Sequence, residues 1–248
     1  MQAMDKKTNA KKSNVVYKND LNLVSMRKFN SKEMDIFYAL CSKMRERGLK
    51  EVTFTFNYIR TIANYTAHDK QRFVDDLQET YKNMLQMIYK VEYGSKIEYF
   101  VLFTGFVIDT KEETVTISVN PRFEYILNNI NSNFTSFELL HFTSIRSTYA
   151  KTLFRMIKQY HSTGVFAINI EDFRFIFDVP KSYQICHIDQ KIIKPAIRDL
   201  AEFYSVKYEK VKEGKRVKTL VFYFDPVKPA DKEPAKSKIT LYNWLDGK

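Results

Sequence analysis

The stretch that decides the fold is SIRSTYAKTLFRMIKQYHSTG (144–164), followed by VFAINI (165–170) and EDFRFIFDV (171–179). The first segment has apolar residues at helical spacing, a serine that can cap it and Gly164 at its end, so it predicts a helix. VFAINI alternates as a half-buried strand does, and EDFRFIFDV has the pattern of a short helix. This region therefore predicts the order helix, strand, helix.

Downstream, the loop PKSY (180–183) leads to a helix predicted over about 187–203. The strands SVKYEKV (205–211) and RVKTLVFYF (216–224) then flank a basic turn, KEGK. The complete order is helix, strand, helix, turn, helix and hairpin, which is that of a winged helix. In this fold the second helix of a helix-turn-helix enters the DNA major groove, and the hairpin forms the wing.

The same order occurs about 115 residues earlier in the chain. A helix predicted from Asn30, where NSKE has the pattern of a capping box, precedes the strand EVTFTF (51–56) and the short helix NYIRTIANY (57–65). Another helix is predicted over about 69–87. A repeat of this length indicates duplicated domains. The predicted fold class is therefore α+β, with two tandem winged-helix domains related by internal duplication.

The wing of the first unit is predicted around the Gly94-Ser95 turn, which joins MIYKVEY (87–93) to IEYFVLFTGFVID (97–109). The second of these strands is too apolar for a solvated wing. We expect it in the core or at a dimer surface, because sheet edges pair readily. A further strand, TVTISVN (114–120), follows.

These patterns divide the chain into four segments. Residues 1–14 are predicted to form a disordered basic arm, 15–143 the first winged-helix domain, 144–224 the second, and 225–248 a polar tail. The first domain is expected to dimerise and to make auxiliary DNA contact, and the second to be the main DNA reader. The tail ends in ITLYNWLDGK, which contains Trp244. It is either a short docking motif for a partner protein or a segment that packs against its own domain or frays.

Positive charge is concentrated in the second unit. The whole chain carries 40 Lys and Arg against 29 Asp and Glu, a net charge of +11. Residues 144–224 hold 15 positive and 8 negative charges, a net charge of +7, whereas residues 15–143 hold 16 of each. A basic block indicates a polyanionic partner, because phosphates that are neutralised release condensed counterions. We therefore expect double-stranded DNA as the main partner.

Several other classes of protein are disfavoured by what the sequence lacks. Cys41 and Cys186 lie in apolar, helix-like segments without metal-binding spacing, so we expect two buried free thiols, a reducing cytoplasm and no zinc site. No segment has the character of a membrane span or of a secretory signal. The histidines form no His-apolar-His pair of the kind that binds a catalytic metal. The sequence also has no phosphate-binding loop motif for ATP hydrolysis and no acidic cluster suited to two-metal nuclease chemistry. We expect no cofactor, no metal and no enzymatic activity.

Several stretches along the chain together form a pattern that is known from one family. They are SIRSTYAKTLF (144–154), PKSY (180–183), Lys191, KPAI (194–197), residues 217–224 and NDLNL (19–23). In these stretches the chain resembles the iteron-type plasmid replication initiators. The resemblance covers about residues 15–225 and has no single signature. It implies a tandem winged-helix protein that binds direct repeats as a monomer and forms dimers that act in autorepression or copy control. The segment QICHID (184–189) departs from the better-known members because it lacks an arginine cluster, so base contacts must come from other side chains.

The candidate DNA-contacting residues of the second unit lie on three segments. On the predicted 187–203 helix, the outward residues are Gln190, Lys191, Lys194 and Arg198, with His187 near the start. Glutamine pairs with adenine, and arginine or lysine pairs with guanine. The candidates for phosphate contact are Lys181, Ser182 and Tyr183 before the helix, and Lys212, Lys215, Arg216 and Lys218 in the wing. The alternative interpretation is a solvated basic face.

The corresponding positions of the first unit carry a different balance of charge. The outward residues there are Thr66, His68, Lys70, Gln71, Arg72 and Lys82. The same helix also carries Asp69, Asp75, Asp76 and Glu79, which would repel phosphate. Fewer base contacts are therefore expected in the first unit.

The predicted function is that of a plasmid replication initiator, which binds direct repeats at an origin in double-stranded DNA, promotes origin opening and recruits the host replisome. One alternative is a winged-helix transcriptional repressor without a role in initiation. Another is a protein-interaction scaffold that binds no DNA. The partners expected besides DNA are a second copy of the chain in one state and host replication proteins, and no membrane is expected.

Overall fold

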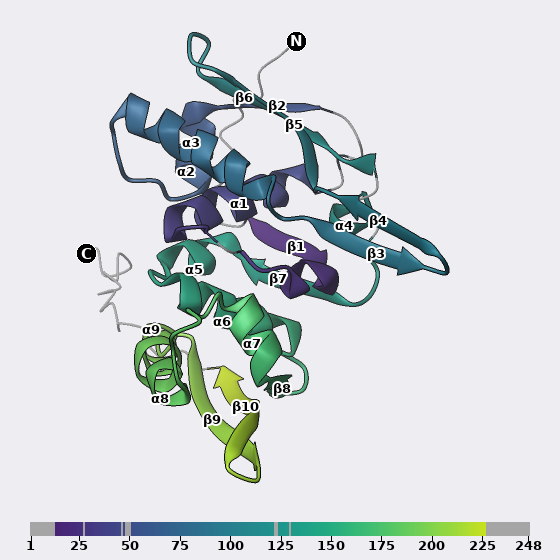
Figure 1. Ribbon diagram of the computed structural model, residues 1–248. Coiled ribbons are helices and arrows are strands. Elements are labelled where there is room, and N and C mark those ends of the chain that lie inside the picture. The colour runs from purple at the N-terminus through teal and green to yellow at the C-terminus, as the bar shows by residue number, and fades with distance from the viewer. Residues whose placement is uncertain are drawn as a thin grey trace, which may run out of the picture.

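The computed structural model describes residues 13–26, 28–45, 47, 51–121, 124–128 and 130–226. Two units lie at opposite ends of an elongated molecule, with the N-terminal unit at the top of Figure 1 and the C-terminal unit at the bottom. The predicted arm up to residue 12 and the predicted tail from residue 227 lie outside the described residues.

The first unit is a winged helix with one inserted hairpin. Its three helices are α1 (Ser31–Met44), α2 (Phe56–Ile62) and α3 (Lys70–Met84). An antiparallel sheet in the order β2-β6-β5 is formed by β2 (Val52–Thr55), β5 (Phe103–Asp109) and β6 (Thr114–Val119). The predicted capping box is present, because the Asn30 side chain accepts from the Glu33 amide while the Glu33 carboxylate accepts from the Asn30 amide.

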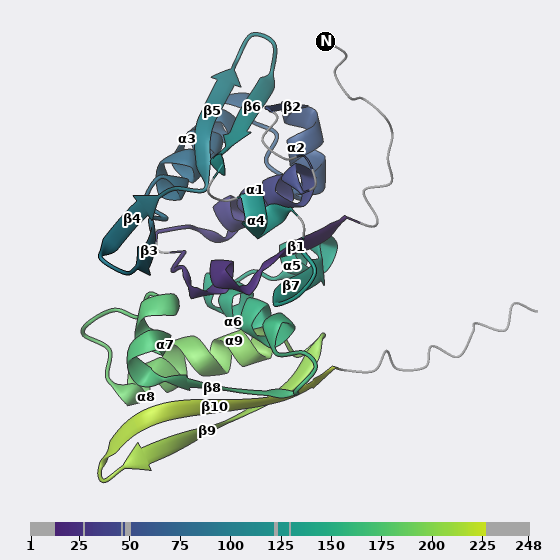
Figure 2. The same ribbon diagram turned by 90° about the vertical axis from the view of Figure 1, so that its right-hand side faces the viewer.

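The second unit repeats this design. Its helices are α6 (Thr148–Gln159), α7 (Ile170–Ile176) and a continuous helix made of α8 (Ile185–Ile188), the π-helical turn η4 (Asp189–Ile193) and α9 (Lys194–Asp199). Its sheet, in the order β8-β10-β9, is formed by β8 (Val165–Asn169), β9 (Tyr204–Glu213) and β10 (Arg216–Pro226). Figure 2 shows the helices of this unit gathered on one face of the sheet. The two sheets have the same topology, which confirms the prediction of two tandem winged helices.

The wing of the first unit is not the hairpin that the sequence predicted. The Gly94 turn joins β3 (Tyr89–Tyr93) to β4 (Lys96–Phe100), and these two strands form a sheet of their own. The long strand predicted at 97–109 is broken after Phe100, because Leu102 and Phe103 are buried in the core. The wing is therefore β5–β6. The β3–β4 hairpin is an insertion that projects from the body of the molecule (Figure 1).

A two-stranded sheet connects the beginning and the end of the first unit. In this sheet β1 (Asn14–Lys18) pairs antiparallel with β7 (Phe134–Glu138). The 3₁₀ helix η2 (Asn19–Leu23) follows β1. Helix α4 (Glu124–Leu127) packs against β1. From β7 the chain continues through α5 (Leu139–Ser144) into α6. The beginning of the first unit, from Asn14 onward, is therefore fixed beside the junction of the two units.

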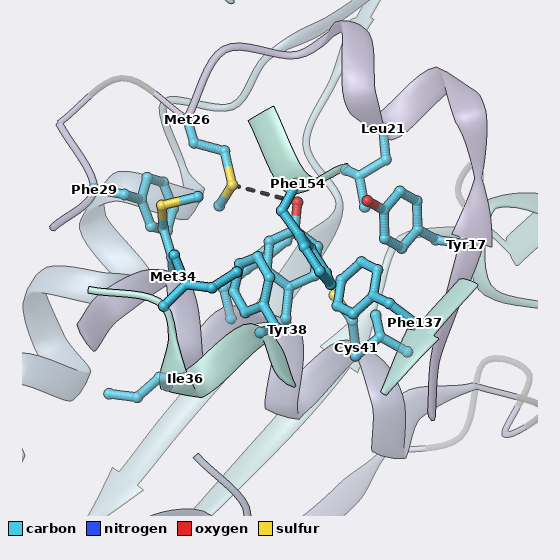
Figure 3. Close-up of a cluster of buried hydrophobic side chains, with 14 of the residues drawn as sticks. Tyr17, Leu21, Met26, Phe29, Met34, Ile36, Tyr38, Cys41, Phe137 and Phe154 are labelled. Carbon is cyan, nitrogen blue, oxygen red and sulfur yellow. Dashed lines mark hydrogen bonds between the residues drawn. The ribbon is translucent and has the colours of Figure 1, made fainter. Parts of the chain in front are cut away.

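Helix α6 belongs to the cores of both units. Every residue from Ala150 to Ile157 is buried. The ring of Phe154 contacts Phe137 of the first unit with 5.5 Å between centroids, and Tyr204 of the second unit with 6.2 Å. Figure 3 shows Phe154 within the cluster of buried side chains that includes Phe137. One continuous hydrophobic core therefore joins the two units.

A buried polar network fixes α6 against the first unit. Lys151 Nζ forms an ion pair with Asp35 of α1 and donates to the Ser31 carbonyl at 2.8 Å. One turn further along α6, Arg155 Nε donates to the Asn22 side-chain oxygen at 3.1 Å. Burial raises the pKa of Asp35 and lowers the pKa of Lys151, and each opposite charge offsets part of that effect. A buried charge is costly unless it is paired. These contacts therefore favour a single position of α6 against the first unit.

Candidate nucleic-acid interface

The continuous helix 185–199 of the second unit has the two faces that the sequence predicted. The residues on its exposed face are Gln190, Lys191, Lys194 and Arg198. The buried residues on its other face are Ile188, Ile192, Ile193 and Ala196, followed by Leu200 just beyond the helix. The helix is thus held to the core by aliphatic side chains and presents a polar, basic surface. We call it the second recognition helix.

Hydrogen bonds order the loop that precedes this helix. Arg174 of α7 donates to the Tyr183 carbonyl at 2.8 Å. The Gln184 amide donates to Nδ1 of His187 at 3.2 Å, so the His187 side chain caps the helix. Because Nδ1 is used as a cap, DNA contact by His187 would have to use its other ring nitrogen. Lys181 and Ser182 are exposed beside this ordered loop.

The aromatic ring of Tyr183 supports one of the predicted base-contacting residues. Lys191 Nζ lies 5.0 Å from the centroid of the Tyr183 ring, which is half-buried. A cation over an aromatic face is attracted by the ring quadrupole. Tyr183 therefore serves to position Lys191, a role that the sequence did not predict for it.

The β9–β10 wing is basic at its tip. Its exposed basic residues are Lys212, Lys215, Arg216 and Lys218. Gly214 makes the tight turn between the strands and has a φ of +58°, a conformation that L side chains rarely adopt. Lys218 lies 3.7 Å from Glu213, so its charge is partly offset. Lys212, Lys215 and Arg216 form no ion pair within the described part of the chain.

An open basic groove of about 540 Å³ lies between α7, the start of the second recognition helix and the wing. Its basic side chains are Arg174, Lys210, Lys212, Lys215 and Arg216, and Ile170, Ile185 and Val217 line the remainder. Arg174 and Lys210 were not among the residues predicted to contact DNA. Arg174 lies on the helix before the second recognition helix, and Lys210 lies on the first strand of the wing, where it is paired with Asp189. Only the packing of α7 and β9 around the helix brings them together. A groove with this charge is suited to the phosphates of a DNA backbone.

The corresponding surface of the first unit is less available to phosphate. Its predicted residues Thr66, His68, Lys70, Gln71, Arg72 and Lys82 are all exposed. Lys70, however, forms a 2.6 Å ion pair with Glu113 at the tip of the β5–β6 wing, and this cation lowers the pKa of Glu113. Lys82 lies 3.3 Å from Glu79, and Gln71 donates to Asp75 at 2.9 Å.

Two of the acids predicted to repel phosphate in the first unit have structural partners. Asp69 caps α3 by accepting from the Arg72 amide, and Asp76 accepts from the Tyr65 hydroxyl. The tip of the first wing, DTKEE (109–113), carries three acids and one lysine. The charge contrast that the sequence predicted between the two units therefore extends to their wings.

The prediction that both cysteines are buried is wrong for one of them. Cys41 is buried, and burial raises the pKa of its thiol, but Cys186 is exposed at the start of α8. The reason is that Ile185 and Ile188 turn toward the core, which leaves Cys186 on the outer side of the helix. The described residues contain no group of three His, Cys, Asp or Glu that could hold a metal ion. Among the described helices, none has the length and apolarity needed to cross a membrane.

The fold and this surface define the class of the protein. Two winged helices share one core, and the second combines an exposed basic recognition helix with a basic wing and groove. These are the features of a tandem winged-helix DNA-binding protein.

Comparison with known proteins identifies the family. Residues 14–158 match the family model "Initiator Replication protein, WH1", and residues 169–224 match the family model "Initiator Rep protein, WH2". A "Probable replication protein rep" of Bifidobacterium longum (strain NCC 2705) is 31% identical over 229 residues, which are 90% of this chain and 77% of that protein. The chain therefore belongs to the initiator replication protein family, which confirms the resemblance seen in the sequence.

A solved structure has the same fold. The crystal structure of Pi initiator protein in complex with iteron DNA superposes with a TM-score of 0.68, at 16% sequence identity, over 88% of this chain and 99% of that chain. The first family match includes nearly all of α6, in agreement with the packing of this helix on the first unit.

Proposed function

We propose that this protein is a plasmid replication initiator that binds direct repeats in double-stranded origin DNA, promotes opening of the origin and recruits host replication proteins. The observation that carries the proposal is the basic surface of the second unit, formed by the second recognition helix, the wing and the groove between them. Family membership supports it, as does the shared fold with an initiator that was crystallised with iteron DNA. On this proposal the protein acts by binding alone, in the cytoplasm, without a catalytic step or a cofactor.

The two units are proposed to contribute unequally. The second domain (144–224) is the main reader, because most of its exposed cations form no ion pair within the described residues. The first domain (15–143) makes only auxiliary contacts, because Lys70 and Lys82 form ion pairs with carboxylates. Of the predicted arm (1–14) and tail (225–248), Asn14 belongs to β1 and residues 225–226 belong to β10. The remainder of the arm and of the tail would add contacts to DNA and to a host protein, respectively.

The first unit is also proposed to dimerise. Ile97 and Tyr99 of β4 and Val107 of β5 have 57%, 65% and 63% of their surface exposed, a large fraction for apolar and aromatic side chains. β5 is an edge strand of its sheet, and unpaired edges are templates for pairing with another chain. We propose that these strands form the surface between two copies, in a state separate from the monomer bound to repeats.

The test is a gel-shift titration with the variant Lys191→Ala and Lys194→Ala. We expect it to lose preference for the origin repeats over a scrambled duplex while its circular dichroism and melting temperature are unchanged, because both side chains are exposed and leave the core intact. The matched control, Lys96→Ala with Lys111→Ala, removes the same charge from exposed sites of the first unit and should keep the preference. Unchanged affinity in the first variant would refute the assignment of the second recognition helix.

Footprinting separates the proposal from its alternatives. Protection of several regularly spaced direct repeats supports an initiator, whereas protection of one palindrome supports a repressor. A protein-interaction scaffold would bind no duplex at any salt concentration. DNA binding by the proposed contacts should instead weaken steeply as salt is raised, because each phosphate contact releases a counterion.

A further inference from the structure

The second recognition helix is not a regular α-helix. In the π-helical turn η4, the Lys194 amide donates to the Asp189 carbonyl five residues earlier, where an α-helix would use a spacing of four. Pro195 explains the wider turn. Proline has no amide hydrogen, and its ring clashes with the carbonyl four residues before it, which here is that of Lys191.

The first residue of this turn is anchored to the wing. The Asp189 carboxylate accepts from the Tyr208 hydroxyl at 3.2 Å and forms an ion pair with Lys210, and both partners lie on β9. The Asp189 side chain is 13% exposed. Burial, together with this carboxylate, raises the pKa of Tyr208 to about 12, so its hydroxyl keeps the proton that it donates. The wide turn is therefore held at a fixed place on the strand.

The anchored turn divides the residues predicted to contact bases. Gln190 and Lys191 lie on the turn, whereas Lys194 and Arg198 follow it, and all four are exposed. One residue turns an α-helix by about 100°. A turn that is wider by one residue therefore changes the direction of the later side chains relative to the earlier ones. Such interruptions occur frequently at functional sites.

We propose that Asp189 is a positioning residue for sequence recognition. By anchoring the π-helical turn to β9, it sets the angle at which Gln190 and Lys191, on one side, and Lys194 and Arg198, on the other, meet consecutive base pairs. This inference rests on the proposed function, because it concerns the same DNA-reading face. It gives a role in specificity to an acidic residue whose charge alone would oppose DNA binding.

Neutralising Asp189 distinguishes the positioning role from two simpler roles, because each role predicts a different change in DNA affinity. If Asp189 were only a negative charge near DNA, Asp189→Asn would strengthen binding to every duplex alike, because Lys210 would also be released. If Asp189 only stabilised the fold, binding to every duplex would decrease together with the melting temperature. A positioning role predicts a split, in which affinity for the repeats decreases while affinity for an unrelated duplex is unchanged or increases.

The experiment uses the full chain and fluorescence anisotropy with two duplexes, one containing the origin repeats and one with the same composition in scrambled order. For Asp189→Asn we expect the ratio of the two affinities to decrease on the order of tenfold, which is the loss typical of one mismatched base pair. Tyr208→Phe should decrease the ratio less, because it removes one of the two anchors. The charge-matched control is Glu202→Gln, which neutralises an exposed carboxylate just beyond the helix and should leave the ratio unchanged.

The outcomes are distinguishable from failure of the proposed function. A wild-type protein that does not distinguish the two duplexes overturns the proposed function and this inference with it. A wild-type protein that does, with an unchanged ratio in both anchor variants, overturns this inference alone. If Asp189→Asn melts at a lower temperature, the affinity ratio of Tyr208→Phe becomes the deciding measurement, because that variant keeps the ion pair between Asp189 and Lys210. Pro195→Ala restores an amide hydrogen and should change the sequence that is selected from random duplexes.

Discussion

Replacing Lys151 by methionine should destabilise the protein strongly, because it leaves a buried charge without its partner. The side chains of Lys151 and Asp35 are 0% and 2% exposed. Removing one member of such a pair typically costs about 3–5 kcal/mol, since the remaining charge is neither hydrated nor paired. Domains of this kind have unfolding free energies of about 5–15 kcal/mol. The variant should therefore lose at least about a fifth of the stability of the protein.

The pH dependence of this loss follows from the direction of one pKa shift. Burial already raises the pKa of Asp35 in the folded state, and Lys151 offsets part of that effect. Without Lys151 the pKa of Asp35 rises further, while its value in the unfolded chain stays at about 3.9. A carboxyl whose folded pKa is raised contributes stability at low pH and loses it as pH rises. The penalty of Lys151→Met should therefore be larger at pH 8.5 than at pH 6.

The assay is urea denaturation of the wild type, the variant Lys151→Met and the double variant Asp35→Leu with Lys151→Met. A buried ion pair can often be replaced by apolar residues of similar volume with little loss, so the double variant should recover most of the unfolding free energy. A cost below about 1 kcal/mol for the single variant would refute the argument that the pair is buried and coupled. A double variant less stable than the single one would refute it as well.

Three further predictions concern the shared core and the two surfaces proposed to contact DNA. Phe154→Ala should lower the free energy of unfolding by about 3–5 kcal/mol. Because this ring contacts both cores, calorimetry should show both units melting at a lower temperature in one transition, and two separate transitions would contradict that. Lys215→Ala with Arg216→Ala should weaken binding to all duplexes alike and reduce the slope of log affinity against log salt by about two. A change in sequence preference would instead show that these side chains read bases. Lys70→Ala should change DNA affinity by less than threefold in anisotropy titrations, because Glu113 already neutralises this lysine; a tenfold loss would show that the pair opens on DNA.

The repeated elements of the fold were predictable because their signals are local. Helical spacing, capping residues and terminal glycines lie within a few positions of one another, as in α1 with its cap Asn30 and in α6 with its cap Ser147. The outward face of the second recognition helix was predictable for the same reason. Its buried aliphatic residues recur at helical spacing, so the remaining positions face solvent.

The parts that were not predictable depend on contacts between distant residues. The break at Val101 in the strand predicted over 97–109 has no local turn signal, and only the burial of Leu102 and Phe103 in the core explains it. β1 has a partner about 120 residues later, and no local pattern specifies that pairing. Lys210 looks like an ordinary strand residue until β9 is packed beside Asp189.

Because both units share helix α6, the first unit can add to DNA affinity even if its own contacts are weak. If the two units were joined by a flexible linker, each would lose its own translational and rotational freedom on binding, and a surface with neutralised cations would gain little. Here one continuous core and the network around Lys151 and Arg155 hold the units together. On the proposed function, binding of the second unit would leave the first already oriented, so even a few contacts from Arg72 or His68 would add to affinity without that cost. On the proposed function, the charge asymmetry of the two units is therefore compatible with DNA contact by both.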